Sequence, residues 1–437
     1  MAEIKTDINI VENLFKNPLI QYIGDNTLCA RSGIMTQIDI DNMSNNIVTA
    51  IDEGATLRSS KNGIYHKRSI STLGKDALNK LFEKNIDRND ELNLYESIRT
   101  INRSSTEEKI ELLKFMNNQL KDRLKDVKID IVYLDSEEYK LYVDNTGAIL
   151  HNQGSVFIQI NIQIDDYTFI ESIGINLTYD NINDLYKRVD NIIEEFQEKL
   201  DIIKKIKVIK YNSAKPMILD PSLAGAFVHE IYGHSLEADN ISHIYKKLKI
   251  DPKLEITDSP VLPSGIVNYQ YDDEGALATE NVLIKDGKIK SLIHDKESSK
   301  HFNVIPTGNG RSESYTNDIL PRMTNLIINK GEWNLEEAIS DIKDGYYGYG
   351  FIGGGHNPLF NNYSVSPQLC CKISNGNIDG VIRNAYMTGN IIDTLKNIVA
   401  IGKDQENTAA VCHKKNQTAI VGIISPFLKI KKVSIIC

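Results

Sequence analysis

The chain has 437 residues, which is too long for one ordinary compact core, so we expect two domains. Hydrophobic residues make up 41% of the sequence and charged residues 25%, proportions that exclude a disordered chain and indicate a globular protein. The formal net charge of -9 disfavours nucleic acid and anionic membranes as partners, because both attract basic surfaces.

Five cysteines are scattered along the sequence, and an odd, scattered set in a chain of this length does not indicate a disulfide framework. The first residues, MAEIKTDINI, lack a basic region followed by an apolar stretch. No later run approaches the ~20 apolar residues that a membrane-spanning helix needs. We therefore expect a cytoplasmic protein in a reducing compartment, with neither a membrane nor a nucleic acid as its partner.

Two patterns in the first half of the chain predict a helix and a hairpin. Ser105 with Glu108 forms a capping box, and apolar residues follow at helical spacing, which predicts an amphipathic helix over residues 105–124. Strict alternation over 158–164 predicts a strand with one buried face. The pair Asp165-Asp166 should turn this strand into a second one at 167–170.

A long helix should end the first domain. Asp180 is a suitable N-cap, and apolar residues keep helical spacing from Ile182 to Ile203. The helix should end near Lys207. We therefore place an N-terminal domain at 1–207 and a C-terminal domain at 208–437.

Short apolar runs separated by turn dipeptides dominate the second half. Asp286-Gly287 and Asn375-Gly376 are such dipeptides and are typical of hairpins. The predicted fold class is α+β. It combines an N-terminal α/β domain, with a mainly antiparallel sheet and long helices, and a strand-rich C-terminal domain that carries one conspicuous helix.

That helix should begin with Asp220 as its N-cap and Pro221 at its first position, where the missing N–H costs nothing. Its later turns hold His229, Glu230 and His234. Zinc peptidases of the HExxH kind place two histidines four residues apart, which leaves them about 40° apart on one face. Histidines five residues apart would splay by about 140°, so they share an ion only if the helix kinks, ends or widens.

Gly233 lies where such a distortion would cost least. Spacing alone leaves two interpretations of the motif open. Either His229 and His234 bind a metal beside Glu230, or they are ordinary partly buried histidines and Glu230 is a solvated helix charge.

The segment HEIYGHSLEAD resembles the signature of the TldD/PmbA family of peptidases. Further segments match that family in the same order, and together they span roughly residues 215–430. They are 271–275 (YDDEG), 281–296 (NVLIKDGKIKSLIHDK), 307–311 (TGNGR) running into SESY, 321–325 (PRMTN) and 353–355 (GGG). The preceding residues resemble the family's N-terminal domain only in general pattern.

This resemblance implies a TldD-type zinc metallopeptidase. Zn2+ would be held by His229, His234 and Cys412, which leaves a fourth position open for water. Glu230 would be the catalytic base that takes the proton of the zinc-activated water. The implied substrates are short, unfolded or leader-containing peptides. The implied assembly is a homodimer, or a heterodimer with a related TldD/PmbA-family subunit.

Cys412 and the other cysteine and histidine residues of the C-terminal half allow more than one interpretation. A lone cysteine is more often a small buried hydrophobe than a ligand, so Cys412 depends on the resemblance. His413 stands where the family usually has a glycine, and it could lie at the surface, support the ligands or compete with them. The pair Cys370-Cys371 is expected in the core, because neighbouring strand residues point to opposite faces.

Four further residues are candidates for substrate binding or for orienting the ligands. Glu237 and Asp239 could hydrogen-bond the ligand imidazoles, or could be solvated acids at a helix end. Arg311 could hold a peptide carboxylate, steady an oxyanion or form a structural salt bridge. Gly354 could let a peptide approach the backbone, or could belong to a mobile loop. The remaining histidines show no ligand spacing and should be surface or core residues: His66, His151, His243, His294, His301 and His356.

Three alternatives to a zinc peptidase stay open. The first is a tailoring enzyme of a peptide or small-molecule biosynthetic pathway that uses the same metal site. The second is a non-catalytic partner subunit of a TldD-type dimer, although the intact motif counts against it. The third is an accidental motif in a protein that binds no metal.

Overall fold

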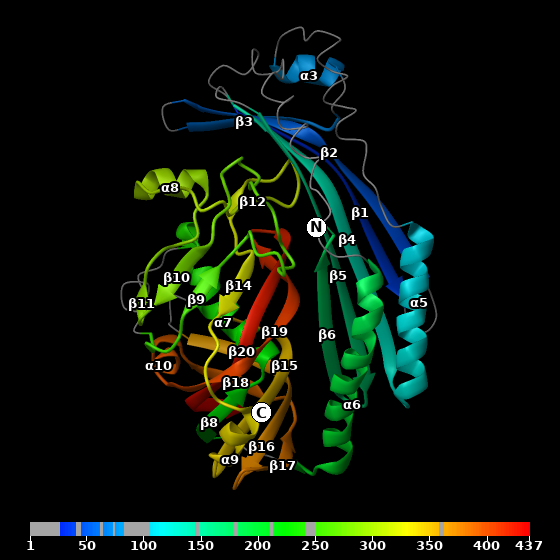
Figure 1. The fold of residues 1–437 in the computed structure, drawn as a ribbon, viewed down its shortest axis with the longest axis vertical. Coiled ribbons are helices and arrows are strands. Elements are labelled where there is room, and N and C mark those ends of the chain that lie inside the picture. The colour runs from blue at the N-terminus through cyan, green and yellow to red at the C-terminus, as the bar shows by residue number, and fades with distance from the viewer. Residues whose placement is uncertain are drawn as a thin grey trace, which may run out of the picture.

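The computed structural model describes residues 27–40, 45–61, 64–72, 75–82, 105–144, 148–177, 182–209, 213–240, 250–357 and 362–437. Two large sheets organise these residues. Figure 1 shows the N-terminal strands, blue to green, running beside the C-terminal strands, yellow to red.

The N-terminal sheet has six strands in the order β3-β2-β1-β4-β5-β6, and each neighbouring pair is antiparallel. In β5 the alternate residues Ile158, Ile160 and Ile162 are buried, as the sequence pattern predicts. The chain turns at Asp165, whose φ is 49°, so the predicted hairpin is confirmed. The strands are β1 (Thr27–Ile40), β2 (Asn45–Lys61), β3 (Ile64–Ile70), β4 (Lys128–Val143), β5 (Ala148–Ile164) and β6 (Tyr167–Asn176).

Two long helices, α5 (Thr106–Arg123) and α6 (Val189–Lys205), cover one face of this sheet (Figure 1). The predicted capping box between Ser105 and Glu108 is present. The second helix differs from the prediction, because Ile182–Arg188 forms a 3₁₀ segment, η1, and the α-helix begins only at Val189. The expected cap, Asp180, lies outside the described residues.

The second half contains a twelve-stranded sheet, in which most neighbouring strands are antiparallel. Three pairs are parallel: β8 with β15, β14 with β20, and β7 with β17. The chain has positive φ at Asp286-Gly287 and at Asn375-Gly376, as expected for hairpin turns. The strands are β7 (Val208–Ile209), β8 (Ser213–Leu219), β9 (Ile256–Asp258), β10 (Asn281–Lys285), β11 (Lys288–Ile289), β14 (Asn325–Ile328), β15 (Asp344–Asn357), β16 (Asn362–Ser374), β17 (Asn377–Ile382), β18 (Tyr386–Asn390), β19 (Ile398–Lys414) and β20 (Gln417–Ile436).

Shorter elements complete the described residues. A two-stranded ribbon joins β12 (Gly310–Arg311) to β13 (Leu320–Pro321). The short helices are α3 (Lys75–Phe82), α7 (Pro221–Val228), α8 (Lys296–Phe302), α9 (Leu335–Ser340) and α10 (Ile391–Leu395). None of the helices in the described residues has the length and apolar character needed to cross a membrane.

One hydrophobic cluster extends across both halves of the chain. It joins Ile158 of β5 and Phe196 of α6 to Tyr347 of β15 and Cys371 of β16. The two halves therefore bury apolar surface against each other. The α+β fold class is confirmed, whereas the domain boundary at 207/208 stays a prediction that falls between α6 and β7.

Candidate metal centre

The helix α7 carries the histidine motif towards the interior, and its start is firmly held. Asp220 Oδ1 accepts a hydrogen bond from the Leu223 N–H at 2.7 Å, and Oδ2 accepts one from the Gly350 N–H at 2.8 Å. The predicted N-cap is therefore confirmed, and it also ties α7 to β15. Pro221 occupies the first turn, as expected.

The helix changes its winding at the motif itself. Residues His229–Gly233 form one π-turn, η2, in which the His234 N–H donates to the carbonyl of His229. A hydrogen bond between residues five apart brings together side chains that an α-helix would splay. The predicted widening of the helix is thus confirmed. The short 3₁₀ turns η3 (His234–Leu236) and η4 (Ala238–Asn240) follow.

Gly233 provides space at this turn rather than backbone freedom. Its φ of -51° and ψ of -59° are ordinary helical values that any residue adopts. A Cβ at this position would lie 2.0 Å from Sδ of Met323, which is fully buried. The distortion thus falls where the sequence predicts it, but Gly233 itself is unstrained, and its lack of a side chain leaves room for the Met323 thioether.

The π-turn and β19 bring three donor side chains together. The ligand atoms of His229, His234 and Cys412 all lie within 4.8 Å of one another. Cys412 Sγ is 3.5 Å from His234 Nε2, and the two imidazole centroids are 5.0 Å apart. His229 and Cys412 are almost fully buried. We call these three residues the donor cluster.

The side chains of the donor cluster shift one another's pKa values in the metal-free protein. Burial would raise the pKa of Cys412, but hydrogen bonds and charge from His229 and His234 lower it to about 4. Burial would lower the pKa of His234, yet Cys412 and Glu237 raise it to about 10. The cluster therefore favours a thiolate, which is the form of cysteine that binds metals. Metal binding at this cluster must displace a proton from an imidazole.

Glu237 orients one imidazole, as the sequence analysis proposed. His234 Nδ1 lies 3.0 Å from Glu237 Oε2, which leaves Nε2 directed at Cys412. Glu237 is fully buried, and burial would raise the pKa of its carboxyl, but His234 and Lys414 lower it. A carboxylate on the outer nitrogen is the usual partner of a metal-bound histidine.

Lys414 holds that carboxylate and was missed by the sequence analysis. Its Nζ lies 3.0 Å from Glu237 Oε2, 2.6 Å from Asp239 Oδ1 and 2.8 Å from the carbonyl of Pro321. Lys414 follows Cys412 by two residues on β19, so both side chains point to the same face. Asp239 pairs with Lys414 and Lys415 instead of an imidazole.

Arg322 was also missed, and it fixes the strand that carries the thiol. Its guanidinium donates to the carbonyls of Cys412 at 2.7 Å and Gln417 at 3.4 Å, and the side chain is 1% exposed. Arg322 belongs to the matched segment PRMTN, and this contact gives the arginine a structural role there. The match of this segment to the family was the one feature of the sequence that pointed to Arg322.

Arg311 lies close to the same segment, and its guanidinium binds two main-chain carbonyls. It donates to the carbonyl of Met323 at 2.8 Å and to that of Ile420 at 2.9 Å. Arg311 therefore braces the 321–325 segment against β20. Its role in holding substrate stays a prediction.

Glu230 lies on the π-turn, half-buried beside the donor cluster. Burial raises the pKa of its carboxyl, while His229 and His234 oppose that shift. A Cβ built on Gly355 would lie 4.0 Å from Glu230 Oε2, so β15 passes next to this carboxylate.

The three consecutive glycines of β15, residues 353–355, face different surroundings. Gly354 has a φ of 147°, and its Cβ would meet the Ser364 carbonyl oxygen at 2.5 Å, so it packs against β16. A Cβ on Gly353 would meet no atom of the described residues within 4 Å. The glycine beside Glu230 is thus Gly355 rather than Gly354, because alternate strand residues point to opposite faces.

Among the residues that the structure describes, no other cysteine or histidine belongs to the donor cluster. Cys370 and Cys371 are buried in different hydrophobic clusters, which confirms that their thiols point to opposite faces of β16. His413 is exposed, because it alternates with the buried Cys412 and Lys414. His294 is buried and His301 is exposed. The side chains of the remaining histidines lie outside the described residues: His66, His151, His243 and His356.

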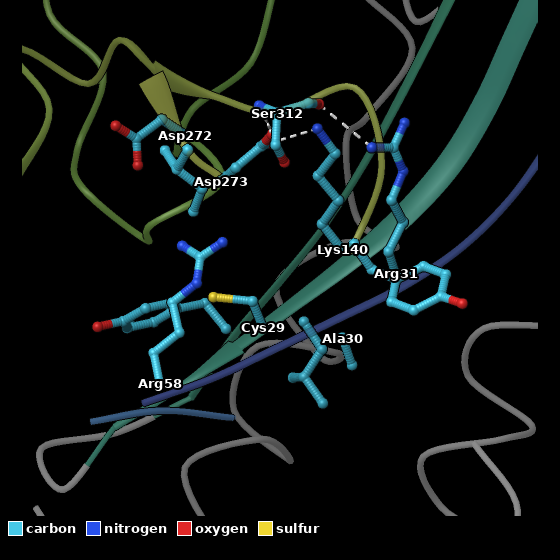
Figure 2. Close-up of a pocket in the computed structure, with 12 residues that line it drawn as sticks. Cys29, Ala30, Arg31, Arg58, Lys140, Asp272, Asp273 and Ser312 are labelled. Atoms are coloured by element: carbon cyan, nitrogen blue, oxygen red, sulfur yellow. Dashed lines mark hydrogen bonds and ion pairs between the residues drawn. The ribbon is translucent and has the colours of Figure 1, made fainter. Parts of the chain in front are cut away.

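A separate, charged pocket lies where the N-terminal sheet meets loops of the second half (Figure 2). Asp273 accepts a hydrogen bond from the Ser312 N–H at 2.8 Å and pairs with Lys140 of β4. Arg31 of β1 donates to the Ser312 carbonyl at 3.3 Å. Burial would raise the pKa of Asp273, but Lys140 and Arg31 hold it well below its usual range. The matched segments at 271–275 and 307–315 therefore join the two halves.

The donor cluster fits a zinc ion. Two imidazoles and one thiolate are ligands that zinc accepts, and three protein ligands leave a position for water or substrate. His229 Nδ1 is buried and has no hydrogen-bond partner among the described residues, although buried polar atoms normally have one. The protein alone thus leaves a ring nitrogen of this ligand unsatisfied.

Comparison with known proteins agrees with this geometry. Residues 212–437 match the family model of the PmbA/TldA metallopeptidase C-terminal domain. A metalloprotease from Archaeoglobus fulgidus is 28% identical over 331 residues, which are 74% of this chain and 76% of that protein. A zinc metalloprotease TldD homolog from Saccharolobus solfataricus is 29% identical over 316 residues, 69% of this chain and 68% of that protein.

The fold is also found in a solved structure. TldE from Thermococcus kodakarensis superposes with a TM-score of 0.75 at 17% identity, covering 98% of this chain and 100% of that chain. The family model covers more than half of the sequence and includes the donor cluster. The chain belongs to the PmbA/TldD family of metallopeptidases.

Proposed function

We propose that the protein is a zinc-dependent peptidase whose centre is the donor cluster with Glu230 beside it. The observation that supports this most strongly is the π-turn, which aligns His229 and His234 towards Cys412. A plain α-helix with this sequence would not place the two imidazoles on one ion. The names of the relatives, metalloprotease and zinc metalloprotease, support the same proposal.

When bound, zinc would supply a Lewis acid that acidifies water and polarises a peptide carbonyl. The protein's own residues would do the rest. Glu230 would accept the proton of the attacking water and pass it to the leaving amine, and a raised pKa makes its carboxylate a better proton acceptor. Glu237 and Lys414 would keep His234 in the tautomer whose Nε2 binds the ion.

The proposed substrates are short, unfolded or leader-containing peptides. The support is the unobstructed backbone of β15 beside the catalytic carboxylate, where Gly353 and Gly355 carry no side chains. An extended peptide that approached here would meet main chain rather than side chains, so it would be recognised with little regard to sequence. Folded proteins would be poor substrates, because their backbone is already paired.

The first experiment measures the zinc content of purified protein and of the His234→Ala and Cys412→Ala variants. Near-stoichiometric zinc in the wild type and strong loss in both variants are expected. His413→Ala is the matched control, since it changes an exposed neighbour of Cys412 on the same strand. Wild-type protein that contains no zinc would refute the proposal.

The second experiment separates metal binding from catalysis. Glu230→Gln should retain zinc and lose hydrolysis of an unstructured peptide, because the amide cannot accept the water proton. Unchanged turnover in this variant would exclude Glu230 as the base and leave the metal site itself intact.

A further inference from the structure

A cleft of about 500 Å³ lies between the two halves of the chain, where α6 and β6 face β15 and β19 (Figure 1). Sites for small ligands usually enclose about 300–1,000 Å³, so this cleft has the size of a ligand site. It is separate from the donor cluster, because about 13 Å of helix lies between Asp220, at the cleft, and His229. We call it the acidic cleft, after the carboxyl groups that line it: Glu171, Glu195, Glu198, Asp220, Asp404 and Glu406.

Negative charge exceeds positive charge in the acidic cleft. Among the described residues that line it, the bases are Arg188 and Lys199. Lys199 pairs with Glu171, and Arg188 donates to the carbonyl of Gly174 at 3.1 Å. The remaining carboxyl groups of the cleft have no ion-pair partner within the described part of the chain. The cleft therefore holds uncompensated negative charge that a cationic ligand would neutralise.

Glu195 and Glu406 show the effect of this imbalance. Both side chains are open to solvent in the cleft, but its walls remove part of their hydration. This desolvation, together with Glu171, raises the pKa of Glu195 to about 8. Desolvation and the charge of Asp220 raise the pKa of Glu406 to about 7. A positive charge beside these carboxyl groups would favour their ionised forms, so a bound cation would relieve the crowding.

Tyr347 of β15 supplies an unused polar group at the wall of the cleft. The residue is 3% exposed, yet its hydroxyl has no hydrogen-bond partner among the described residues. Buried tyrosine hydroxyls usually have such a partner. The ring of Tyr349 lies 4.3 Å from that of Tyr347 between centroids, and its hydroxyl donates to Glu198 Oε1 at 3.2 Å. The Tyr347 oxygen is thus left as an acceptor for a ligand in the cleft.

The arrangement of the carboxyl groups favours an organic cation over a metal ion. A metal site needs several oxygen atoms around one point, and no three described carboxyl groups of the cleft bring their oxygens within 4.8 Å of one another. The negative charges are instead spread over the walls. The rings of Tyr347, Tyr349 and Phe427 form an aromatic part of the lining. Such rings attract ammonium groups and pack against methylene chains.

We propose that the acidic cleft binds a flexible alkylamine that carries two or more ammonium groups. The ammonium groups pair with the carboxylates of α6 and β19, one of them donates to the Tyr347 hydroxyl, and the methylene chain packs against the aromatic rings. This ligand joins the two halves of the chain at a place that the proposed peptidase chemistry does not use. A free polyamine and the lysine side chains of a short peptide both supply these groups.

Titration calorimetry with spermidine tests the site. The wild type should bind spermidine, and Glu195→Gln should weaken the binding about fivefold, because it removes one partly exposed ion pair. Glu194→Gln is the matched control: it removes the same charge from the neighbouring residue of α6, whose side chain does not line the cleft. Equal affinities of the two variants, or a wild type that binds no spermidine at millimolar concentration, would overturn the inference.

Further titrations separate the proposed ligand from its alternatives. Tyr347→Phe should also weaken spermidine binding while its circular dichroism matches the wild type. Butylamine, which has one ammonium group, and Mg²⁺ should bind more weakly than spermidine, and tighter binding of Mg²⁺ would overturn the inference in favour of a metal site. Trilysine carries its ammonium groups on a peptide, so its affinity relative to spermidine identifies their source. Zinc content of Glu195→Gln should equal that of the wild type, which keeps this test independent of the peptidase proposal.

Discussion

Replacing Lys414 with methionine tests how the protein supports its proposed metal site. The substitution keeps the length of the side chain and removes the ammonium, whose three partners are Glu237, Asp239 and the Pro321 carbonyl. Lys414 and Glu237 are 5% and 0% exposed in their side chains, so water cannot replace the lost contact. The carboxylate of Glu237 would remain buried with His234 as its main partner.

Two magnitudes follow from this geometry. Breaking a buried ion pair by removing one partner costs about 3–5 kcal/mol of unfolding free energy, which guanidinium unfolding of the metal-free protein measures. Loss of a group that orients a metal ligand weakens metal binding by about 10–100-fold, which a chelator competition titration measures. Both effects should occur together, because stability and metal affinity both depend on the position of the Glu237 carboxylate.

The neighbouring lysine provides the control. Lys415 Nζ lies 2.9 Å from Asp239 Oδ2, but its side chain is 57% exposed. An exposed pair contributes at most about 1 kcal/mol, so Lys415→Met should change stability little and leave zinc affinity unchanged. If the two variants lose equal stability and affinity, the buried chain from Lys414 through Glu237 to His234 is not what holds the site.

Two further predictions concern the proposed substrate face and Glu274, which follows the pocket residues Asp272 and Asp273. Gly355→Val would place methyl groups beside Glu230, so peptide hydrolysis should fall at least about tenfold while zinc content stays constant; equal activity would remove β15 from the substrate path. Burial, with Asp272 nearby, raises the pKa of Glu274 to about 8, so the folded state retains a proton that the unfolded state loses above about 4.3. Stability should therefore fall as the pH rises from about 4.3 to 8, and Glu274→Gln should flatten that fall in unfolding measured at several pH values; parallel profiles would contradict the assignment.

The elements that local pattern determines were predictable from the sequence. The capping box at Ser105, the alternation over 158–164 and the turn dipeptides each depend on neighbouring residues, and the structure confirms them. The start of α6 was not predictable in the same way. Ile182 and Leu185 keep helical spacing and are buried, yet they lie in a 3₁₀ segment, which spacing does not distinguish from an α-helix.

The proposed metal site was likewise predictable only where it depends on neighbouring residues. The need for a wider turn between His229 and His234 follows from helix geometry alone, and the hydrogen bond between them bears it out. The contact between Gly233 and Met323 could not be predicted from local sequence, because Met323 lies far along the chain. Lys414 and Arg322 were missed for the same reason: each acts on a partner that only the tertiary fold brings close.

The most direct test of the account is X-ray absorption at the zinc edge on the purified wild-type protein, compared with Cys412→Ser. We expect near-stoichiometric zinc with one sulfur and two imidazole nitrogens in its first shell, and loss of the sulfur signal in the variant. A zinc shell without sulfur in the wild type, or protein that binds no zinc, would contradict the central claim that His229, His234 and Cys412 form a metal centre.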